Sequence, residues 1–241
     1  MKNKLWSFGC SFTAEYHPLN ETPPNNYDRY REFKGGELPP VWPTILSERL
    51  GLENSNKGVG ASSNYHIFYQ FCKFCSELKE DDVVIVGWTS PYRFILASKE
   101  YNFLQSILPK VEYRPEEYDQ SVIDYILVNR DNPIWNEEII SFTRIIDEVC
   151  KEKKCKVFYW SFHLDVIEYI QAKYENYSED KYILGHDGEE LDKTLRYGIE
   201  RTATIQKETK NLINDLHFGE YGHQKQANYF YNHIKPKIKF K

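Results

Sequence analysis

The sequence lacks several features that would place it in a familiar class of protein. Basic residues do not outnumber acidic ones, and the formal net charge of -5 argues against a general nucleic-acid binder. No apolar run approaches the roughly 20 residues that a membrane span needs, so no membrane partner is expected. The N-terminal stretch "MKNKLWSFGCSF" has too few consecutive apolar residues for a signal peptide. The expected compartment is therefore the cytoplasm, with a phage or virion context as an open alternative.

Cysteine is also scarce, and the five cysteines form an odd set, which argues against a disulfide framework. Cys72 and Cys75 form a C-x-x-C pair, the spacing of many zinc and redox sites. These two cysteines continue a helical spacing of apolar residues, so we expect a buried stripe instead of a metal site. The stripe comprises Ala61, Tyr65, Phe68, Cys72 and Cys75. Cys150 and Cys155 flank a lysine-rich join and are likewise expected to be buried thiols.

Short apolar runs alternate with helical patterns along the chain, which indicates a parallel sheet covered by helices on both faces. The pattern predicts one α/β domain over residues 1–241 with about five strands. Strands are expected at 4–8, 54–59, 83–88 and 156–162, and helices at 42–51, 61–79, from 134 onward and from about 219 to 233.

Three stretches fit this alternation poorly and are expected to be loop insertions: residues 14–41, 101–132 and 163–203. The first is rich in proline, asparagine and glycine. A loop of that length in a compact domain is usually functional, and this one could form a lid or a substrate-facing wall.

A serine, Ser11, stands where the first strand must turn, in the stretch "LWSFGCSFT". Open α/β sheets bind ligands just past the carboxyl ends of their strands, so an exposed Ser11 could be a nucleophile. The same position also suits a helix N-cap.

Two further stretches carry residues that could assist a nucleophile. Asp215 lies two residues before His217, and a carboxylate can hold a histidine in the tautomer that a general base requires. The stretch "NKGVGASSNYH" has backbone N–H groups that could cradle negative charge, or a tight turn capped by Ser62 or Ser63. His66 and His223, near helix starts, are expected to serve helix-end packing.

Taken together, the blocks "GCS", "GASSN", "GWTS" and "DLH" resemble, in content and order, those of the SGNH hydrolases, the GDSL esterase and lipase superfamily. The resemblance implies a flavodoxin-like three-layer α/β/α sandwich and ester hydrolysis without a metal or organic cofactor. It also implies that Ser11 is the nucleophile, His217 the general base and Asp215 its orienting acid. The oxyanion hole would use the backbone N–H groups of Ser11 and Gly60.

The chain departs from the family pattern at several positions. Cys10 stands in place of the family's aspartate before the serine, and Thr89 stands where the third block has asparagine. The Thr89 hydroxyl could donate one hydrogen bond to the oxyanion from a shorter side chain, or Asn64 could supply the missing amide. Asn214 stands at the family spacing from the histidine, so it competes with Asp215 as the orienting residue. Ala61 could replace Gly60 as an N–H donor.

The expected substrate is a small-molecule or carbohydrate ester, with an O-acetyl group on a carbohydrate favoured over a long-chain lipid. Trp88 and Tyr92 could form a platform for sugar stacking or simply wall the core. Arg93 could bind a substrate carboxylate or form a structural salt bridge. Two other functions stay open: a non-catalytic glycan- or protein-binding module on the same fold, and an O-acyltransferase.

Overall fold

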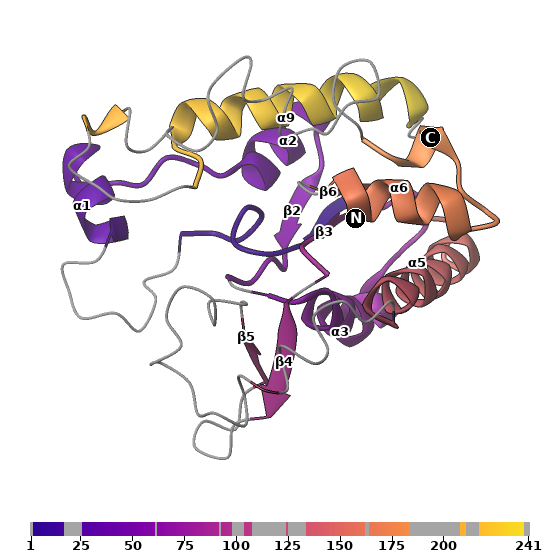
Figure 1. Ribbon diagram of the computed structural model, residues 1–241. Helices are drawn as coiled ribbons and strands as arrows, with labels where there is room; N and C mark the ends of the chain where they lie inside the picture. The colour runs from indigo at the N-terminus through magenta and orange to yellow at the C-terminus, as the bar shows by residue number, and fades with distance from the viewer. Residues whose placement is uncertain are drawn as a thin grey trace.

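A four-stranded parallel sheet forms the centre of the protein (Figure 1). The computed structural model describes residues 2–16, 26–60, 62–91, 93–97, 104–107, 124, 134–161, 164–183, 208–210 and 217–238. The strands are β1 (Lys4–Phe8), β2 (Glu53–Asn56), β3 (Val83–Trp88) and β6 (Lys156–Ser161), in the spatial order β2-β1-β3-β6. A parallel bridge between Tyr159 and Tyr182 extends the sheet beyond β6. The four predicted strands are therefore confirmed, although β2 begins one residue earlier and ends three residues earlier than expected.

The register aligns the strands so that all four end at one edge of the sheet. Leu5 pairs with Asn54 of β2 and with Val83 of β3, and Val83 in turn pairs with Lys156. The turns that follow β1, β2 and β3 therefore gather at the same edge, as expected for parallel strands in this order.

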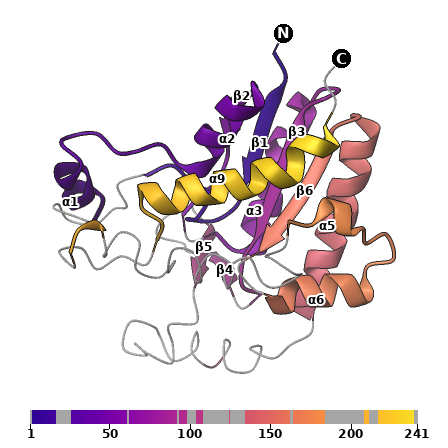
Figure 2. The same cartoon turned by 90° about the horizontal axis from the view of Figure 1, so that it is seen from above.

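Helices cover both faces of the sheet, which gives the predicted three-layer α/β/α sandwich. The helices are α1 (Asn26–Phe33), α2 (Trp42–Leu50), α3 (Asn64–Phe74), α5 (Ile134–Glu152), α6 (Leu164–Lys173) and α9 (Glu220–Ile234), with 3-10 turns η1 (Cys75–Glu77), η4 (Glu179–Lys181) and η7 (Lys235–Lys237). Figures 1 and 2 show α2 and α9 on one face and α3 and α5 on the other. No helix in the described ranges is long and apolar enough to span a membrane.

Alternate residues of each strand contribute to the hydrophobic cores on the two faces of the sheet, because successive side chains of a strand point in opposite directions. All six residues of β3 are buried, which explains its unbroken apolar sequence. The core under α2 and α9 contains Leu5, Val83, Ile85, Phe158 and Trp160. The core under α3, α5 and α6 contains Trp6, Phe8, Val84, Val86 and Tyr159.

The expected buried stripe on α3 is wrong. Cys72 is exposed, Cys75 is partly exposed and Tyr65 is 47% exposed, whereas the helix buries Ile67 and Phe71. Aromatic residues occur all around this helix, so the apolar periodicity did not distinguish the inner face from the outer one. Cys150 and Cys155 are buried, as predicted, and burial raises the pKa of both thiols.

The three expected insertions carry some regular structure where they are described. Helix α1 lies within 14–41, and α6 and η4 lie within 163–203. Strand β4 (Phe94–Ala97) pairs antiparallel with β5 (Leu104–Ile107), which begins inside 101–132. This second sheet was not expected from the sequence.

Asp82, which is 2% exposed, stabilises the end of the sheet at which the strands begin. Its carboxylate accepts hydrogen bonds from the Lys4 N–H at 2.8 Å, the Trp6 indole at 2.9 Å and the Lys79 N–H at 3.1 Å. Three donors satisfy the buried charge and hold β1 beside β3. The opposite edge carries the candidate site.

Candidate active site

Ser11 lies in a tight turn directly after β1. The Cys10 carbonyl accepts hydrogen bonds from the N–H groups of Thr13 at 2.8 Å and Ala14 at 3.0 Å. This places Ser11 at the second position of the turn, partly exposed, while Cys10 is buried. The N–H of Ser11 has no acceptor among the described residues. Ser11 therefore stands at the end of a strand with part of its surface open to solvent.

The loop after β2 runs beside this turn. The Lys57 N–H donates to the Ser7 carbonyl at 2.8 Å and the Val59 N–H to the Gly9 carbonyl at 3.0 Å, so the parallel pairing continues past the strand ends. At Gly58 an added Cβ would come within 2.6 Å of the Ala14 nitrogen. The loop after β2 and the turn after β1 can therefore lie this close together only with glycine at position 58.

Gly60 follows in a turn in which Ser62 donates to the Val59 carbonyl through its hydroxyl, at 2.8 Å. Gly60 is partly exposed and lies next to the segment that pairs with Gly9. Ser11 and Gly60 thus lie on adjoining turns at one edge of the sheet. Ala61, the alternative N–H donor, lies outside the described residues.

Asn64, the first residue of α3, uses its carboxamide to hold the end of β3. Its Oδ1 accepts from the Thr89 N–H at 2.8 Å, and its Nδ2 donates to the carbonyls of Thr89 at 2.9 Å and Ser90 at 3.4 Å. Asn64 and Thr89 are both buried, at 6% and 3% exposure. The amide is therefore engaged by main chain, and it cannot donate to an oxyanion while this pairing holds.

The start of α3 has a second fixed point at Ser63 and His66. The Ser63 hydroxyl accepts from the His66 N–H at 3.2 Å, which makes Ser63 the N-cap, one of the two residues considered. The His66 ring lies between Ser62 Oγ, at 3.2 Å, and Gln70 Nε2, at 3.0 Å. Burial lowers the pKa of His66. This histidine is held by its own helix, as predicted.

His217 lies against the turn that carries Ser11. The rings of Phe12 and His217 have centroids 4.9 Å apart, and Phe12 directly follows Ser11. Phe12 is held in turn by Trp42, whose indole donates to the Phe12 carbonyl at 2.8 Å. The contact between Phe12 and His217 brings together two segments more than 200 positions apart in the sequence. Asp215 and Asn214, the two candidates for orienting His217, lie outside the described residues.

The segment just after His217 is anchored by a hydrogen-bond network that no sequence motif predicts. Tyr30, buried in α1, donates to Glu208 at 2.6 Å and accepts from the Glu220 N–H at 2.8 Å. Glu208 also accepts from the Tyr221 N–H at 3.2 Å, so its carboxylate caps the N-terminus of α9. An added Cβ on Gly219 would lie 2.6 Å from that carboxylate. These contacts fix where α9 begins, three residues after His217.

His223, on the first turn of α9, stays neutral. Its Nδ1 accepts from the Trp42 N–H at 3.2 Å, and the residue is 3% exposed. Burial, with a smaller contribution from the charge of His217, lowers the pKa of His223 to about 3. A histidine with this pKa is a poor general base near neutral pH, and His223 instead joins α9 to α2, the helix-end role expected of it.

The two residues expected to contact substrate lie in different surroundings. Trp88 is 1% exposed and stacks on Tyr159 at a centroid distance of 6.3 Å, so it walls the core, the second of the two roles considered. Arg93 lies beyond the end of β3 and donates through Nη1 to the Ser62 carbonyl at 3.2 Å. Tyr92 lies outside the described residues.

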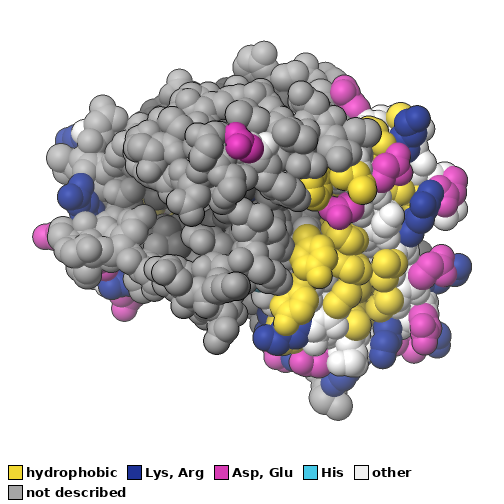
Figure 3. Space-filling view, turned by 60° about the horizontal axis from the view of Figure 1, so that its bottom comes forward, with side chains coloured by type: hydrophobic (Ala, Val, Ile, Leu, Met, Phe, Trp, Pro, Cys, Tyr) yellow, Lys and Arg dark blue, Asp and Glu magenta, His cyan; other side chains and the backbone are white. Residues whose placement is uncertain are grey.

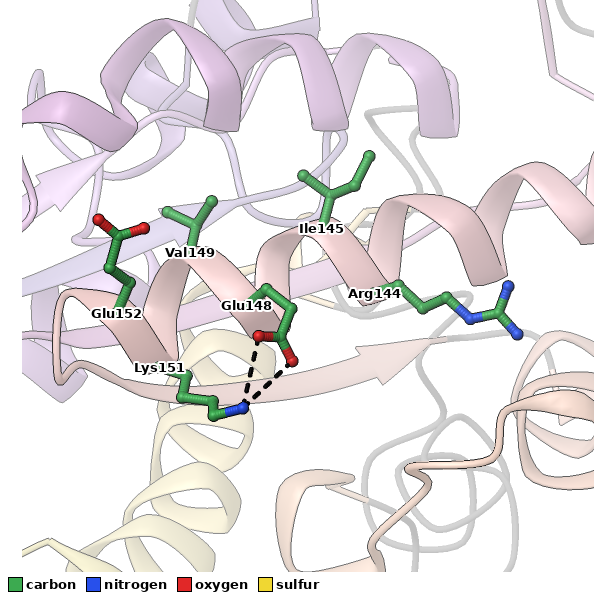
Figure 4. Close-up of a pocket in the computed structure, with 6 residues that line it drawn as sticks. All are labelled: Arg144, Ile145, Glu148, Val149, Lys151 and Glu152. Atoms are coloured by element: carbon green, nitrogen blue, oxygen red, sulfur yellow. Dashed lines mark hydrogen bonds and ion pairs between the residues drawn. The ribbon is translucent and has the colours of Figure 1, made fainter.

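Two hollows in the described surface lie away from these residues. One of about 580 Å³ runs along the outer side of α5, where Figure 4 shows the Glu148–Lys151 ion pair beside Ile145 and Val149. Another, of about 560 Å³, lies where β6 begins. Hydrophobic side chains gather on the described part of the face in Figure 3, and Tyr65, Tyr69 and Ile145 are among the exposed ones on α3 and α5. Within the described ranges, no three histidine, cysteine or acidic residues converge as metal ligands.

No known protein family and no curated protein matches the sequence. Among solved structures, the chain is similar to a protein assigned to the lipolytic G-D-S-L family from Desulfitobacterium hafniense DCB-2. The two chains share 12% sequence identity, with 96% of this chain and 99% of the other covered and a TM-score of 0.40. The function therefore has to be inferred from the residues at the edge of the sheet.

Proposed function

We propose that this protein is a serine esterase that cleaves a carboxylic ester through an acyl-enzyme on Ser11. The observation that carries the proposal is the contact between the rings of Phe12 and His217, because it brings a histidine to the turn that exposes Ser11. A serine hydroxyl is a weak nucleophile until a neighbouring base accepts its proton.

The proposed reaction begins when His217 accepts the proton of the Ser11 hydroxyl as Oγ bonds to the ester carbon. The N–H groups of Ser11 and Gly60 donate to the oxyanion that forms. His217 then gives its proton to the departing alcohol, and water releases the acid from Ser11 by the same steps. Asp215 is the proposed orienting acid for His217.

The proposed oxyanion hole keeps the two backbone N–H groups that the family resemblance implies and lacks the side-chain amide of the family's third block. The Asn64 amide is bonded to the main chain of Thr89, which leaves the two backbone N–H groups as the proposed donors. Loss of a single oxyanion donor typically costs a factor of about 100 to 1,000 in rate. We therefore expect a slow esterase, acting on a small ester such as an O-acetyl group on a carbohydrate.

The test is covalent labelling of the intact protein with a fluorophosphonate probe, with the adduct located by mass spectrometry. Ser11 should be labelled in the wild type and in His66→Ala, which removes another histidine in contact with a serine. Ser11→Ala and His217→Ala should not be labelled. Absence of labelling in a well-folded wild type, or an adduct on Ser62, would contradict the proposal and favour a binding module.

A further inference from the structure

Arg93 joins the turns that follow β2 and β3. Its N–H donates to the Ser90 carbonyl at 3.3 Å, which closes a turn just past β3. Its guanidinium donates to the Ser62 carbonyl at 3.2 Å, and Ser62 is bonded to Val59 on the other side of Gly60. The Val59 N–H reaches the Gly9 carbonyl, so a continuous series of hydrogen bonds connects the cation to the chain around Ser11.

The charge of Arg93 is not neutralised by an acid within the described part of the chain. No described carboxylate lies within ion-pair distance of the guanidinium, and the acceptor of its hydrogen bond in the described part of the chain is a neutral carbonyl. Its Nε is buried and lacks a hydrogen-bond acceptor in the same part of the chain. A partly buried charge without an opposite charge beside it is costly, and proteins usually pair such groups.

Arg144 is an example of an arginine in a structural salt bridge. It lies on the outside of α5, and its guanidinium meets Glu175 with two hydrogen bonds of 3.0 and 2.6 Å. Arg93 is more buried than Arg144 and would gain more from such a partner, yet it has none among the described carboxylates. The structural salt bridge considered for Arg93 is therefore not formed by any described residue.

We infer that Arg93 binds an oxyanion group of the substrate, so that the substrate class is an ester that also carries a carboxylate or a phosphate. The inference rests on the proposed esterase function of Ser11. Guanidinium N–H groups match the geometry of a carboxylate or phosphate and bind either with two parallel hydrogen bonds. An acetyl ester of an acidic sugar meets both this requirement and the proposed carbohydrate class.

Paired substrates that differ in charge test the inference. Acetylated glucose is compared with acetylated glucuronate, which places a carboxylate on the alcohol, and with acetylated glucose phosphate. Arg93→Gln removes the charge but keeps an N–H donor on a shorter side chain, and Arg144→Gln is the control. In the wild type, kcat/KM should be higher for at least one of the two anionic esters than for the neutral ester. Arg93→Gln should lower kcat/KM for that anionic ester about 10- to 100-fold, and should change kcat/KM for the neutral ester by less than about threefold.

Arg93→Lys should recover part of the loss, because it restores the charge without the planar fork. Comparable losses on neutral and anionic esters, or no preference in the wild type, would overturn the inference.

Labelling of Ser11 separates this inference from the proposed function. The fluorophosphonate carries no anionic group, so wild type and Arg93→Gln should label at similar rates. Inorganic phosphate or acetate should slow labelling of the wild type more than that of Arg93→Gln. Labelling that is equally insensitive to both anions would overturn the role of Arg93 and leave the esterase in place. A wild type that is not labelled at all would overturn the esterase itself.

Discussion

Acidification should destabilise the protein through His223, whose imidazole is buried and accepts the Trp42 N–H. Burial lowers its pKa from 6.5 to about 3 in the folded state. The unfolded chain binds the proton near pH 6.5, whereas the folded chain resists it until about pH 3. Between these values the unfolded state holds more protons, so the free energy of unfolding falls as the pH is lowered.

The expected magnitude follows from the width of this interval. Each pH unit below 6.5 removes about 1.4 kcal/mol, so His223 alone should account for about 2.7 kcal/mol lost by pH 4.5. Urea unfolding of the wild type and of His223→Gln, measured at several pH values between about 7.5 and 4.5, isolates this contribution. Glutamine offers an oxygen to the Trp42 N–H but does not titrate, so the variant should lose the additional slope.

A comparison within the same helix provides the control. His233 is half-buried near the other end of α9, and burial lowers its pKa as well. His233→Gln should therefore remove a smaller part of the pH dependence than His223→Gln does. Equal slopes for the wild type and His223→Gln would refute the reasoning, because they would mean that His223 is protonated as easily in the folded chain as in the unfolded one.

Three further substitutions should lower stability for separate reasons, each measurable by urea unfolding at neutral pH. Asn64→Ala leaves the buried N–H and C=O of Thr89 without partners, and we expect a loss of about 2–4 kcal/mol. A loss below about 1 kcal/mol would mean that water replaces the amide. Gly219→Ala drives a methyl group against the Glu208 carboxylate and should cost about 1–2 kcal/mol through the lost cap of α9; no loss would contradict that capping role. Asp82→Ala removes the acceptor of three hydrogen bonds and should cost about 3 kcal/mol or more, whereas a neutral effect would show that the sheet edge does not depend on it.

The elements that could be predicted are those whose apolar residues recur at the regular spacing of a strand or a helix. The apolar run of β3 and the alternating steps of three and four on α5 each specify one element, because burial on both faces or on one face imposes that pattern. Helix α3 shows the limit of the method. Its tyrosines and phenylalanines occur on several sides, so only the packing against β1 and β3 selects Ile67 and Phe71 as the inner face.

The site could be predicted in part for a topological reason. Parallel strands in the order β2-β1-β3-β6 bring successive turns to one edge, so the positions of Ser11 and Gly60 followed from recognising strands. The cap on α9 could not be predicted, because Tyr30 and Glu208 are 178 positions apart and neither stands in a motif. The role of Asn64 was equally hidden, since its partners are main-chain atoms that every residue possesses.

The pairing of Asn64 with Thr89 has a consequence for how the two positions can vary. Asn64 contributes a carboxamide, which few other side chains can imitate, whereas Thr89 contributes only its peptide N–H and C=O. In a library of random substitutions, position 64 should therefore tolerate almost no residue other than asparagine. Position 89 should tolerate any side chain small enough for its buried surroundings. Variation in natural relatives of this chain should be correspondingly lopsided, with asparagine kept at the start of the helix and alanine, serine, valine or cysteine interchangeable with threonine at the strand end.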